Sequence, residues 1–229
     1  MKKPADWKQR VREAARDFYY LLNRGYSRKS ALHLVASRYD LSHFEKALLN
    51  RCVHEEEYNR SVLEKLSSSA RVHVVVVDFY NVTTTIAEHL EGGELYRCTD
   101  HVIRDNAIAL GRSRKEPEAL LEAFKLAIEA IEDLGAVEAV IVADKQRSHS
   151  KSILGRALEV ARERLSATPI LADKADIAVV EQCRRLGALA ASSDRLILER
   201  VGMAVDLVDV VLRRRGGSVV LDFRELMGL

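Results

Sequence analysis

Apolar side chains recur every three or four positions through the first part of the chain. Residues 4–23 show this spacing and end at the polar sequence NRGY, which predicts an amphipathic helix with a stop signal. Ser27 can cap a second helix over RKSALHLVASRY. Ser42, with Glu45 three residues later, has the pattern of a capping box and predicts the start of one long helix over residues 42–66. We therefore expect an N-terminal module of three helices.

The pattern changes after LSSSA at residues 66–70, which is typical of a linker. Short, continuously apolar segments then alternate with helical ones. Strands that are apolar at every position are buried on both faces, which is typical of a parallel sheet between two layers of helices. The predicted fold class is therefore α/β, with an all-α module over residues 1–66 and an α/β domain over residues 67–229. The expected strands are 72–77, 138–142, 169–172, 188–191, 203–208 and 218–221, and the expected helices lie near 82–90, 117–134, 151–165, 175–186, 194–201 and 209–215.

The N-terminal helices have the spacing of a helix-turn-helix, because the tight turn YDLS joins the second to the third. In that arrangement Lys46, Arg51 and Arg60 of the third helix would face a nucleic acid. The alternative is a helical bundle that packs on the rest of the chain. Residues 1–66 carry 14 Lys and Arg against 9 Asp and Glu, while the remainder carries 22 against 25, so the basic excess lies in this module.

Composition narrows the class of protein. Hydrophobic residues make up 48% and charged residues 31% of the chain, which is enough for a core in a soluble globular protein. No apolar run approaches the ~20 residues that span a bilayer, and MKKPADWKQR lacks the apolar segment of a signal peptide. We therefore expect a cytoplasmic protein with no membrane partner. Cys52, Cys98 and Cys183 are far apart and include no CxxC, so we expect neither a disulfide framework nor a zinc site.

Aspartates follow several of the predicted strands. Asp78 comes after VVVV, Asp144 after VIVA and Asp194 after ALAASS, while Asp176 begins a helix. Because the carboxyl ends of parallel strands meet at one edge of a sheet, these four side chains are expected to converge. Like charges at close range raise one another's pKa values, and a cation relieves this effect. Oxygen-rich sites suit Mg²⁺ or Mn²⁺, so we expect a divalent ion held by Asp78, Asp176 and Asp194, with help from Asp144.

Each of these residues also has a structural alternative. An aspartate after a strand is often the N-cap of the next helix, and Asp173 is interpreted as a solvated loop residue. Asp105 follows a predicted hairpin formed by ELYRC and HVIRD, and either approaches the site or caps a helix. Asn81 is predicted to hold Asp78 by a hydrogen bond or to contact a substrate phosphate. The threonines at residues 83–85 are more typical of helix caps.

Known motifs limit the chemistry further. DFYNVTTT resembles the DxDx[TV] motif of haloacid-dehalogenase-like phosphatases, but Tyr80 replaces the second aspartate, which is the general acid there. A P-loop and a dinucleotide-binding GxGxxG are absent. The better resemblance is to PIN-like nucleases, including the NYN branch, whose first strand ends in DGYNV or DGxN. A later segment of that family resembles KADIAVVEQCRRLGALAASSDRLIL, residues 174–198, with Asp176 and Asp194 in the acidic positions.

The chain also resembles, over nearly its whole length, the DUF434 family, which joins a helical N-terminal region to a PIN-like C-terminal region (DUF5616). The segments DFYNVTTT, GGELYRCTDHVIRD and ADKQRSHSKSI correspond to its motifs. This resemblance implies the PIN-like architecture but no established activity. Phe79 replaces the usual glycine of the first motif and is expected to narrow the approach to the backbone. The third motif is matched only loosely.

The loosely matched segment carries basic and polar side chains. Lys145, Arg147 and Lys151 form a basic rim that can attract a nucleic-acid backbone, or serve as ordinary surface charges. Ser148 and His149 lie between them, and His149 is either a phosphate contact, a proton shuttle or a solvated loop residue. The predicted substrate contacts are Asn81 of the first motif and five residues of this segment, Lys145, Arg147, Ser148, His149 and Lys151.

These observations support three functions. The first is a metal-dependent nuclease for RNA, or DNA, in which the metal lowers the pKa of a bound water and stabilises charge on the scissile phosphate. The second is a non-catalytic nucleic-acid-binding or scaffold protein that keeps the PIN-like fold. The third is a phosphohydrolase of small substrates, which uses the acidic pocket without the basic rim. The N-terminal helices are expected to dock the substrate or to form a homodimer.

Overall fold

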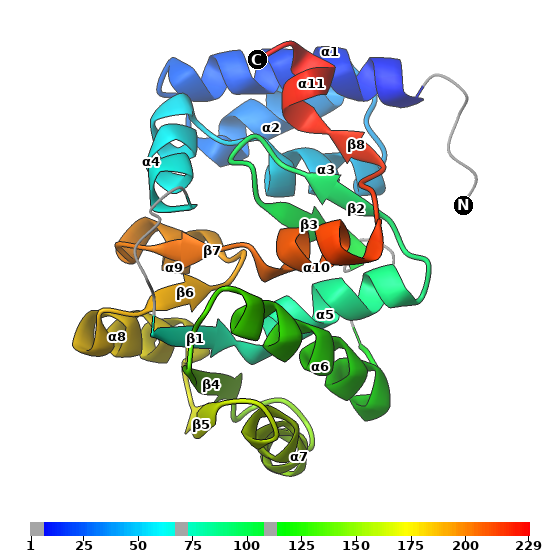
Figure 1. Ribbon diagram of the computed structural model, residues 1–229. Coiled ribbons are helices and arrows are strands. Elements are labelled where there is room, and N and C mark those ends of the chain that lie inside the picture. Colours follow the sequence, from blue (N-terminus) through cyan, green and yellow to red (C-terminus); the bar gives the residue numbers. More distant parts are fainter. Residues whose placement is uncertain (1–6, 67–72, 108–113) are drawn as a thin grey trace.

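The computed structural model describes residues 7–66, 73–107 and 114–229 (Figure 1). Its N-terminal part consists of the helices α1 (Trp7–Asn23), α2 (Arg28–Arg38), α3 (His43–Cys52) and α4 (Glu56–Leu66). The amphipathic character of α1 is confirmed, since Val11, Ala14 and Phe18 are fully buried. The capping box of α3 is also confirmed, because Ser42 Oγ accepts from the Glu45 amide and the Glu45 carboxylate accepts from the Ser42 amide.

The prediction of one long helix over residues 42–66 is wrong at its centre. α3 ends at Cys52, and the next residue, Val53, has an extended backbone. The amide of the next residue, His54, donates to Thr99 Oγ1 over 2.9 Å. The His54 carbonyl accepts from the side-chain amide of Asn59 at 3.2 Å. These partners take the place of helical hydrogen bonds, so the segment divides into α3 and α4.

Five parallel strands form the main sheet: β1 (Val74–Asp78), β4 (Glu138–Asp144), β5 (Ser166–Ala172), β6 (Leu189–Ala191) and β7 (Ala204–Val205). Their order is β5-β4-β1-β6-β7, which places β1 at the centre between β4 and β6. Val75 and Val77 pack into one layer and Val76 into the other, and all three are fully buried. The predicted α/β class, with a parallel sheet buried on both faces, is confirmed.

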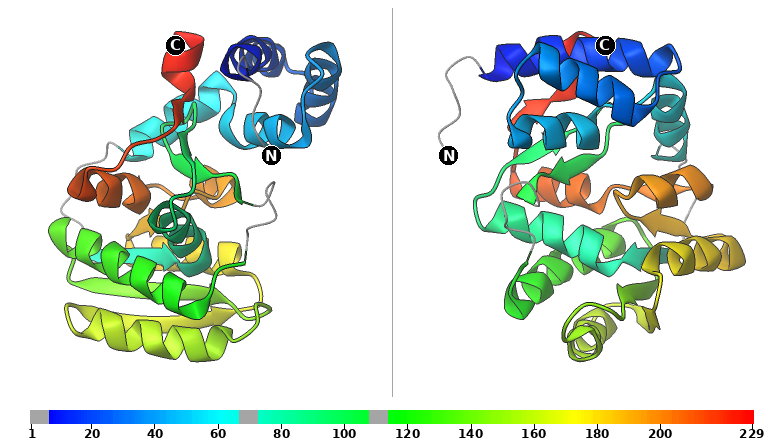
Figure 2. Two further views of the ribbon diagram at one scale, coloured as in Figure 1. Left: turned by 90° about the vertical axis from the view of Figure 1, so that its right-hand side faces the viewer. Right: turned by 180° about the vertical axis from the view of Figure 1, so that it is seen from behind.

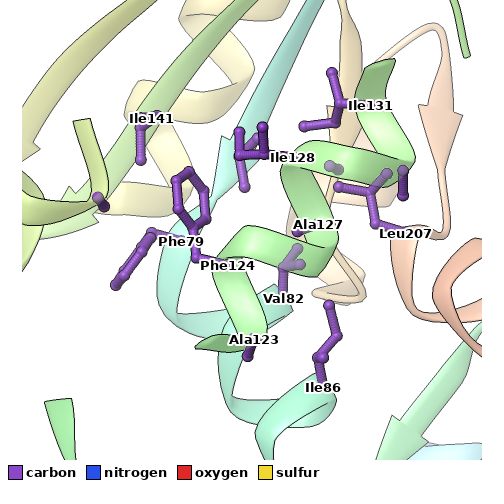
Figure 3. Packing of buried hydrophobic residues seen from close by; sticks show 14 of the residues in the cluster. Phe79, Val82, Ile86, Ala123, Phe124, Ala127, Ile128, Ile131, Ile141 and Leu207 are labelled. Carbon is purple, nitrogen blue, oxygen red and sulfur yellow. The ribbon is translucent and has the colours of Figure 1, made fainter. Parts of the chain in front are cut away.

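Helices cover both faces of this sheet (Figure 1, Figure 2). One layer contains α5 (Phe79–Leu90), α6 (Pro117–Asp133), α7 (Ser150–Arg162) and α10 (Leu207–Arg215). The other contains α8 (Ala175–Leu186) and α9 (Arg195–Arg200), together with α4. Figure 3 shows the first layer, in which the rings of Phe79 and Phe124 pack 5.2 Å apart. None of the helices in the described ranges is long and apolar enough to cross a membrane.

A second, three-stranded sheet lies between the N-terminal helices and the main sheet (Figure 1). The predicted hairpin is confirmed, because β2 (Leu95–Arg97) and β3 (Ile103–Asp105) pair antiparallel. The strand predicted over 218–221 is shorter than expected and is not part of the main sheet. It forms β8 (Leu221–Asp222), which pairs in parallel with β2 and leads into an unpredicted last helix, α11 (Phe223–Met227).

The N-terminal helices share a core with this second sheet. Tyr96, Leu221 and Phe223 are buried in the same cluster as the inner faces of α1, α2 and α3. Arg16 of α1 also donates to the carbonyl of Met227 at the end of α11. The helices therefore pack on the rest of the chain, as the helical-bundle alternative expects.

Cys52 and Cys98 form a disulfide, with Cα atoms 4.2 Å apart. The prediction against a disulfide is therefore wrong for this pair. The two cysteines are separated by 46 positions, and only the folded chain brings the end of α3 against the residue that follows β2. Cys183 is free and buried. The disulfide links the N-terminal helices covalently to the hairpin.

Candidate functional site

The topology of the main sheet brings its strand-end polar residues together. Asp78 and Asp144 are the last residues of β1 and β4, and Asp194 follows β6 in the loop before α9. From β1 the chain builds one side of the sheet through β4 and β5, and then the other side through β6 and β7. The strand order therefore reverses at β1. Ligands bind at such a switch point, in the crevice outside the carboxyl ends of the strands.

An open pocket of about 360 Å³ occupies this position. It is lined by residues that the sequence predicts, namely Asp78, Asn81, Asp144, Arg147, Asp176 and Asp194. The remaining lining residues are Tyr80, Gln146, Asp173, Lys174 and Ala175. The structure thus brings all four predicted aspartates to one pocket, from four different loops or helix starts.

Asp78 lies in a desolvated position beside a second carboxylate. Burial raises the pKa of Asp78 to about 6. The hydrogen bond of 2.8 Å that Ser192 Oγ donates to the carboxylate opposes this rise, whereas the charge of Asp194 adds to it. The guanidinium of Arg147 also favours the charged form. A cation between the two carboxylates would stabilise both in their charged forms.

Two serines after β6 join the two acidic motifs into one hydrogen-bonded unit. Besides donating to Asp78, Ser192 Oγ accepts from the Asp194 amide at 3.0 Å. The side-chain oxygen of Asn81 accepts from the amide and the hydroxyl of Ser193, at 2.7 and 2.9 Å. The Asn81 side chain therefore holds the loop that carries Asp194, and Ser192 holds the Asp78 carboxylate.

Two of the pocket aspartates also accept hydrogen bonds from main-chain amides that follow them, as the structural alternative predicts for an aspartate after a strand. Asp194 Oδ1 caps α9 by accepting from the amides of Leu196 and Ile197, at 2.7 and 3.3 Å. Asp144 Oδ1 accepts from the Gln146 amide at 2.8 Å. Both side chains line the pocket as well. Capping and a place in the pocket are therefore compatible, because a carboxylate has two oxygens.

Arg147 is held at the pocket by Tyr80. Its guanidinium lies 4.4 Å from the centroid of the Tyr80 ring, within the range of a cation–π interaction. The ring is buried, and its hydroxyl lies 2.7 Å from Ser150 Oγ. Ser150 Oγ donates in turn to the Asp144 carbonyl at 2.6 Å. These contacts fix the loop after β4 and orient a planar cation toward the acidic residues.

The other predicted substrate contacts lie at or beyond the rim. Lys145 is exposed and forms a 3.4 Å ion pair with Asp173, which is the solvated loop residue that the sequence predicts. Ser148, His149 and Lys151 are exposed and do not line the pocket. His149 has a left-handed backbone, with φ of 62°, where the loop turns into α7. The basic rim is therefore sparser at the pocket than the sequence predicts.

Asp105 and the threonines of α5 do not line the pocket. Thr85 Oγ1 donates to Asp105 Oδ2 at 2.7 Å, and Thr83 Oγ1 donates to a main-chain carbonyl of its own helix. Thr84 Oγ1 is buried without a hydrogen-bond partner among the described residues. Arg51 of α3 approaches the same Asp105 carboxylate to 3.8 Å. Asp105 thus contacts the N-terminal helices rather than the pocket.

Phe79 leaves the pocket open. Its side chain is fully buried in the helical layer against Phe124 (Figure 3) and is not part of the pocket lining. The expectation that Phe79 narrows the approach to the backbone is therefore wrong, because the ring points into the core. The aromatic residue that lines the pocket is the next one, Tyr80.

The pocket offers suitable donors for a divalent cation without a complete cage. Five aspartates and Asn81 supply oxygen atoms, which Mg²⁺ and Mn²⁺ prefer. Within residues 7–66, 73–107 and 114–229, no three acidic, histidine or cysteine side chains are grouped so that they could hold a metal ion by themselves. Mg²⁺ usually keeps several waters and binds through one or two carboxylates. The adjacent pair of Asp78 and Asp194 therefore fits best.

A larger pocket, of about 620 Å³, lies beside α10 and β8. Its charged side chains pair with one another, since Arg97 lies 2.7 Å from Asp209 and 3.5 Å from Asp222. Arg213 lies 2.6 Å from Asp209 as well. None of the strand-end aspartates of the main sheet lines this pocket. The smaller pocket is therefore the candidate site.

The site includes residues that the sequence does not predict: Tyr80 and Lys174, which line the pocket, and Ser192 and Ser193, which hold its lining residues by hydrogen bonds. Ser192 and Ser193 had a signal, because two hydroxyl residues stand between an apolar strand and Asp194. In the sequence, Tyr80 stands out only because it replaces the second aspartate of the DxDx[TV] motif. Lys174 carries no local signal, because any surface lysine before a helix has the same pattern.

Two family models match the chain. Residues 67–210 match the model of DUF5616, a domain of unknown function, and residues 10–65 match DUF434, a protein of unknown function. The chain is 28% identical over 205 residues to the uncharacterized protein MJ0935 of Methanocaldococcus jannaschii, which covers 86% of this chain and 94% of that protein. No solved structure matches the chain. The protein therefore belongs to the DUF5616 family and carries a DUF434 region before that domain.

Proposed function

We propose that this protein is a metal-dependent nuclease with a PIN-like domain, which hydrolyses RNA with a metal-activated water. One observation carries the proposal. Asp78 is a desolvated carboxylate beside Asp194, in an open pocket lined by three further aspartates, Asp144, Asp173 and Asp176. Such a pair is costly to keep charged without a cation, and a pocket at the switch point of a parallel sheet is open to substrate.

In this proposal Asp78 and Asp194 hold the divalent cation, and Asp144 and Asp176 are available to its water ligands. The bound cation supplies a water of lowered pKa and neutralises charge at the scissile phosphate. The chain's own contribution is positional. Ser192 orients the Asp78 carboxylate, and Asn81 holds the loop of Asp194 through Ser193.

Arg147 contributes a positive charge to the lining of the pocket. A guanidinium can bind two oxygens of one phosphate in a planar fork, and stacking on Tyr80 restricts its orientation beforehand. Because Arg147 covers the Tyr80 ring, that ring is not available to stack a base. Recognition at this pocket then depends on the phosphate backbone and is largely independent of base sequence. A cytoplasmic location suits such a substrate.

A non-catalytic nucleic-acid-binding or scaffold protein is the second candidate. It is favoured by the absence, over the described part of the chain, of three metal-ligating side chains in one group. In this case Arg147 would still bind a phosphate, while the aspartates would serve as helix caps and loop contacts. The two candidates differ in whether RNA is cut.

Cleavage of a labelled single-stranded RNA in Mg²⁺ or Mn²⁺ tests the proposal. The wild type is expected to cut the RNA, and Asp78→Asn and Asp194→Asn are each expected to lower the rate at least about 100-fold, as the loss of a group that stabilises a transition-state charge does. Asp173→Asn is the matched control, because this aspartate lines the same pocket but is exposed and paired with Lys145. RNA binding by the wild type without any cleavage would support the scaffold candidate instead.

A further inference from the structure

Arg51 is a cation of the N-terminal helices that lies outside the lining of the pocket. It belongs to the last turn of α3, and its guanidinium is 3.8 Å from Asp105. Charge-assisted hydrogen bonds are shorter, at about 2.7–2.9 Å. The Nε of Arg51 is buried without a hydrogen-bond partner among the described residues, while 31% of the side chain remains exposed.

Other arginines near this interface are fully engaged. Arg104 makes two hydrogen bonds of 2.7 Å to Asp100, and Arg10 lies 2.7 Å from Glu45. Arg51, by contrast, has donors to spare. Burial lowers the pKa of Arg51, so its charge is desolvated and only in part compensated. A guanidinium with unused donors and an exposed edge is suited to bind an anion.

Arg51 and Arg147 lie on opposite sides of β1. Arg147 is in the loop after β4, and its charge acts on Asp78. Arg51 lies on the β6 side, because it approaches Asp105 to 3.8 Å. The neighbouring Arg104 donates to the carbonyl of Ser193, the residue before Asp194 in the loop after β6. β4 and β6 are the two neighbours of β1 in the sheet. Asp78, at the end of β1, is close enough to Asp194 for the negative charge of Asp194 to raise its pKa. The two acids therefore lie between two guanidinium groups.

We propose that Arg51 binds a second phosphate of the RNA, on the far side of Asp78 and Asp194 from the phosphate bound by Arg147. This inference rests on the proposed function and names its substrate class. The substrate is a single-stranded polynucleotide whose backbone crosses the acidic pair. A mononucleotide or other small phosphoester has one phosphate to offer and reaches only one of the two cations. The N-terminal helices thereby form part of the substrate-binding surface.

Fluorescence anisotropy with a labelled eight-nucleotide RNA tests this inference. All variants are made in the full chain carrying Asp78→Asn, so that the RNA is not cut, and thermal unfolding is measured for each. Arg51→Ala is expected to weaken RNA binding about five- to tenfold, and to reduce the slope of log K against log salt by about 0.7, the value for one phosphate contact on a single strand. Arg51→Lys keeps the charge and should keep the slope.

Arg38→Ala is the control, because Arg38 is a paired arginine of α2 with 69% of its side chain exposed. It should change neither the affinity nor the slope, and competition by adenosine monophosphate should be the same with and without Arg51. If Arg51→Ala does not fold, Arg51→Gln replaces it. An unchanged slope in a folded Arg51 variant, with a reduced slope in Arg147→Ala, would overturn the inference and leave the nuclease proposal standing. Absence of RNA binding by the parent protein would overturn both.

Discussion

The hydroxyl of Ser192 donates a 2.8 Å hydrogen bond to the carboxylate of Asp78, although 114 positions separate the two residues. The same oxygen accepts from the amide of Asp194. One side chain therefore positions both members of the acidic pair. Its place after β6, beside the end of β1, follows from the parallel pairing of these two strands. Ser192 is the contact through which the two sequence motifs become one site.

Replacing Ser192 with alanine removes the hydrogen bond that opposes the raised pKa of Asp78. Hydrogen bonds to a carboxylate favour its charged form, so the pKa of Asp78 should rise further in Ser192→Ala. We expect RNA cleavage at pH 6 to fall about tenfold, since a hydrogen bond to a charged group contributes about 1.5–3 kcal/mol. The acidic limb of the pH–rate profile should move to higher pH. Ser148→Ala, at an exposed serine outside the pocket, should leave the profile unchanged.

Asp78 should also destabilise the metal-free protein at neutral pH. Its pKa is raised from 3.8 to about 6 by burial, so its contribution to stability is full below pH 3.8 and is lost as the pH rises through 6. Asp78→Asn removes this titration. At pH 8 in EDTA, Asp78→Asn is expected to be more stable than the wild type by about 3 kcal/mol in urea unfolding.

The difference should be small at pH 3.5, where the wild-type carboxyl is protonated. Adding Mn²⁺ at pH 8 should stabilise the wild type and not Asp78→Asn, because a ligand stabilises only the state that binds it. If the wild type and Asp78→Asn differed in stability by the same amount at pH 3.5 and at pH 8, the result would contradict the desolvated position of Asp78. The exposed Asp173 provides the control, and Asp173→Asn should show no such difference between the two pH values.

Asp100 and Arg104 form a buried ion pair within the hairpin, and Arg104 connects this pair to the loop that carries Asp194. Both side chains are almost completely buried, two hydrogen bonds of 2.7 Å join them, and Arg104 Nε also donates to the Ser193 carbonyl. Asp100→Ala leaves a buried, uncompensated guanidinium, which should cost about 3–5 kcal/mol in urea unfolding. The exposed pair of Glu118 and Arg156, at 2.8 Å, is the control, and Glu118→Ala should leave the unfolding midpoint unchanged. Similar midpoint shifts in both variants would contradict this assignment.

The disulfide between Cys52 and Cys98 should contribute to stability under oxidising conditions. The disulfide closes a loop of 46 positions in the unfolded chain, which stabilises the folded state by about 4 kcal/mol. Reduction of the wild type is therefore expected to lower the free energy of unfolding by that amount, measured with urea. Cys52→Ala should show the same stability with and without reductant. A reductant effect of equal size in Cys52→Ala would assign the effect to another cause.

Local patterns were enough to predict most of the fold. The continuous valines before Asp78 indicate a strand buried on both faces, and the capping box at Ser42 marks a helix start. Both depend on neighbours in the sequence. The break of the helix after Cys52 was not predictable, because it depends on a hydrogen bond from His54 to Thr99, which is distant in the sequence. The disulfide was missed for the same reason.

The candidate site shows the same limit. Parallel strand ends predicted that Asp78, Asp144 and Asp194 would face one edge, and they line one pocket. The spacing of residues does not give the direction of a side chain, so it could not show that Phe79 turns into the core. It also could not show which basic residue reaches the pocket. That depends on the stacking of Arg147 on Tyr80.

The central claim is that Asp78 and Asp194 form a divalent-metal site, and a crystal soaked in millimolar Mn²⁺ tests it most directly. Anomalous scattering locates manganese independently of any activity. The account predicts anomalous density in the pocket, in contact with the carboxylates of Asp78 and Asp194, and none there in a crystal of Asp78→Asn. A pocket without manganese in the wild type, or manganese bound only elsewhere, would contradict it.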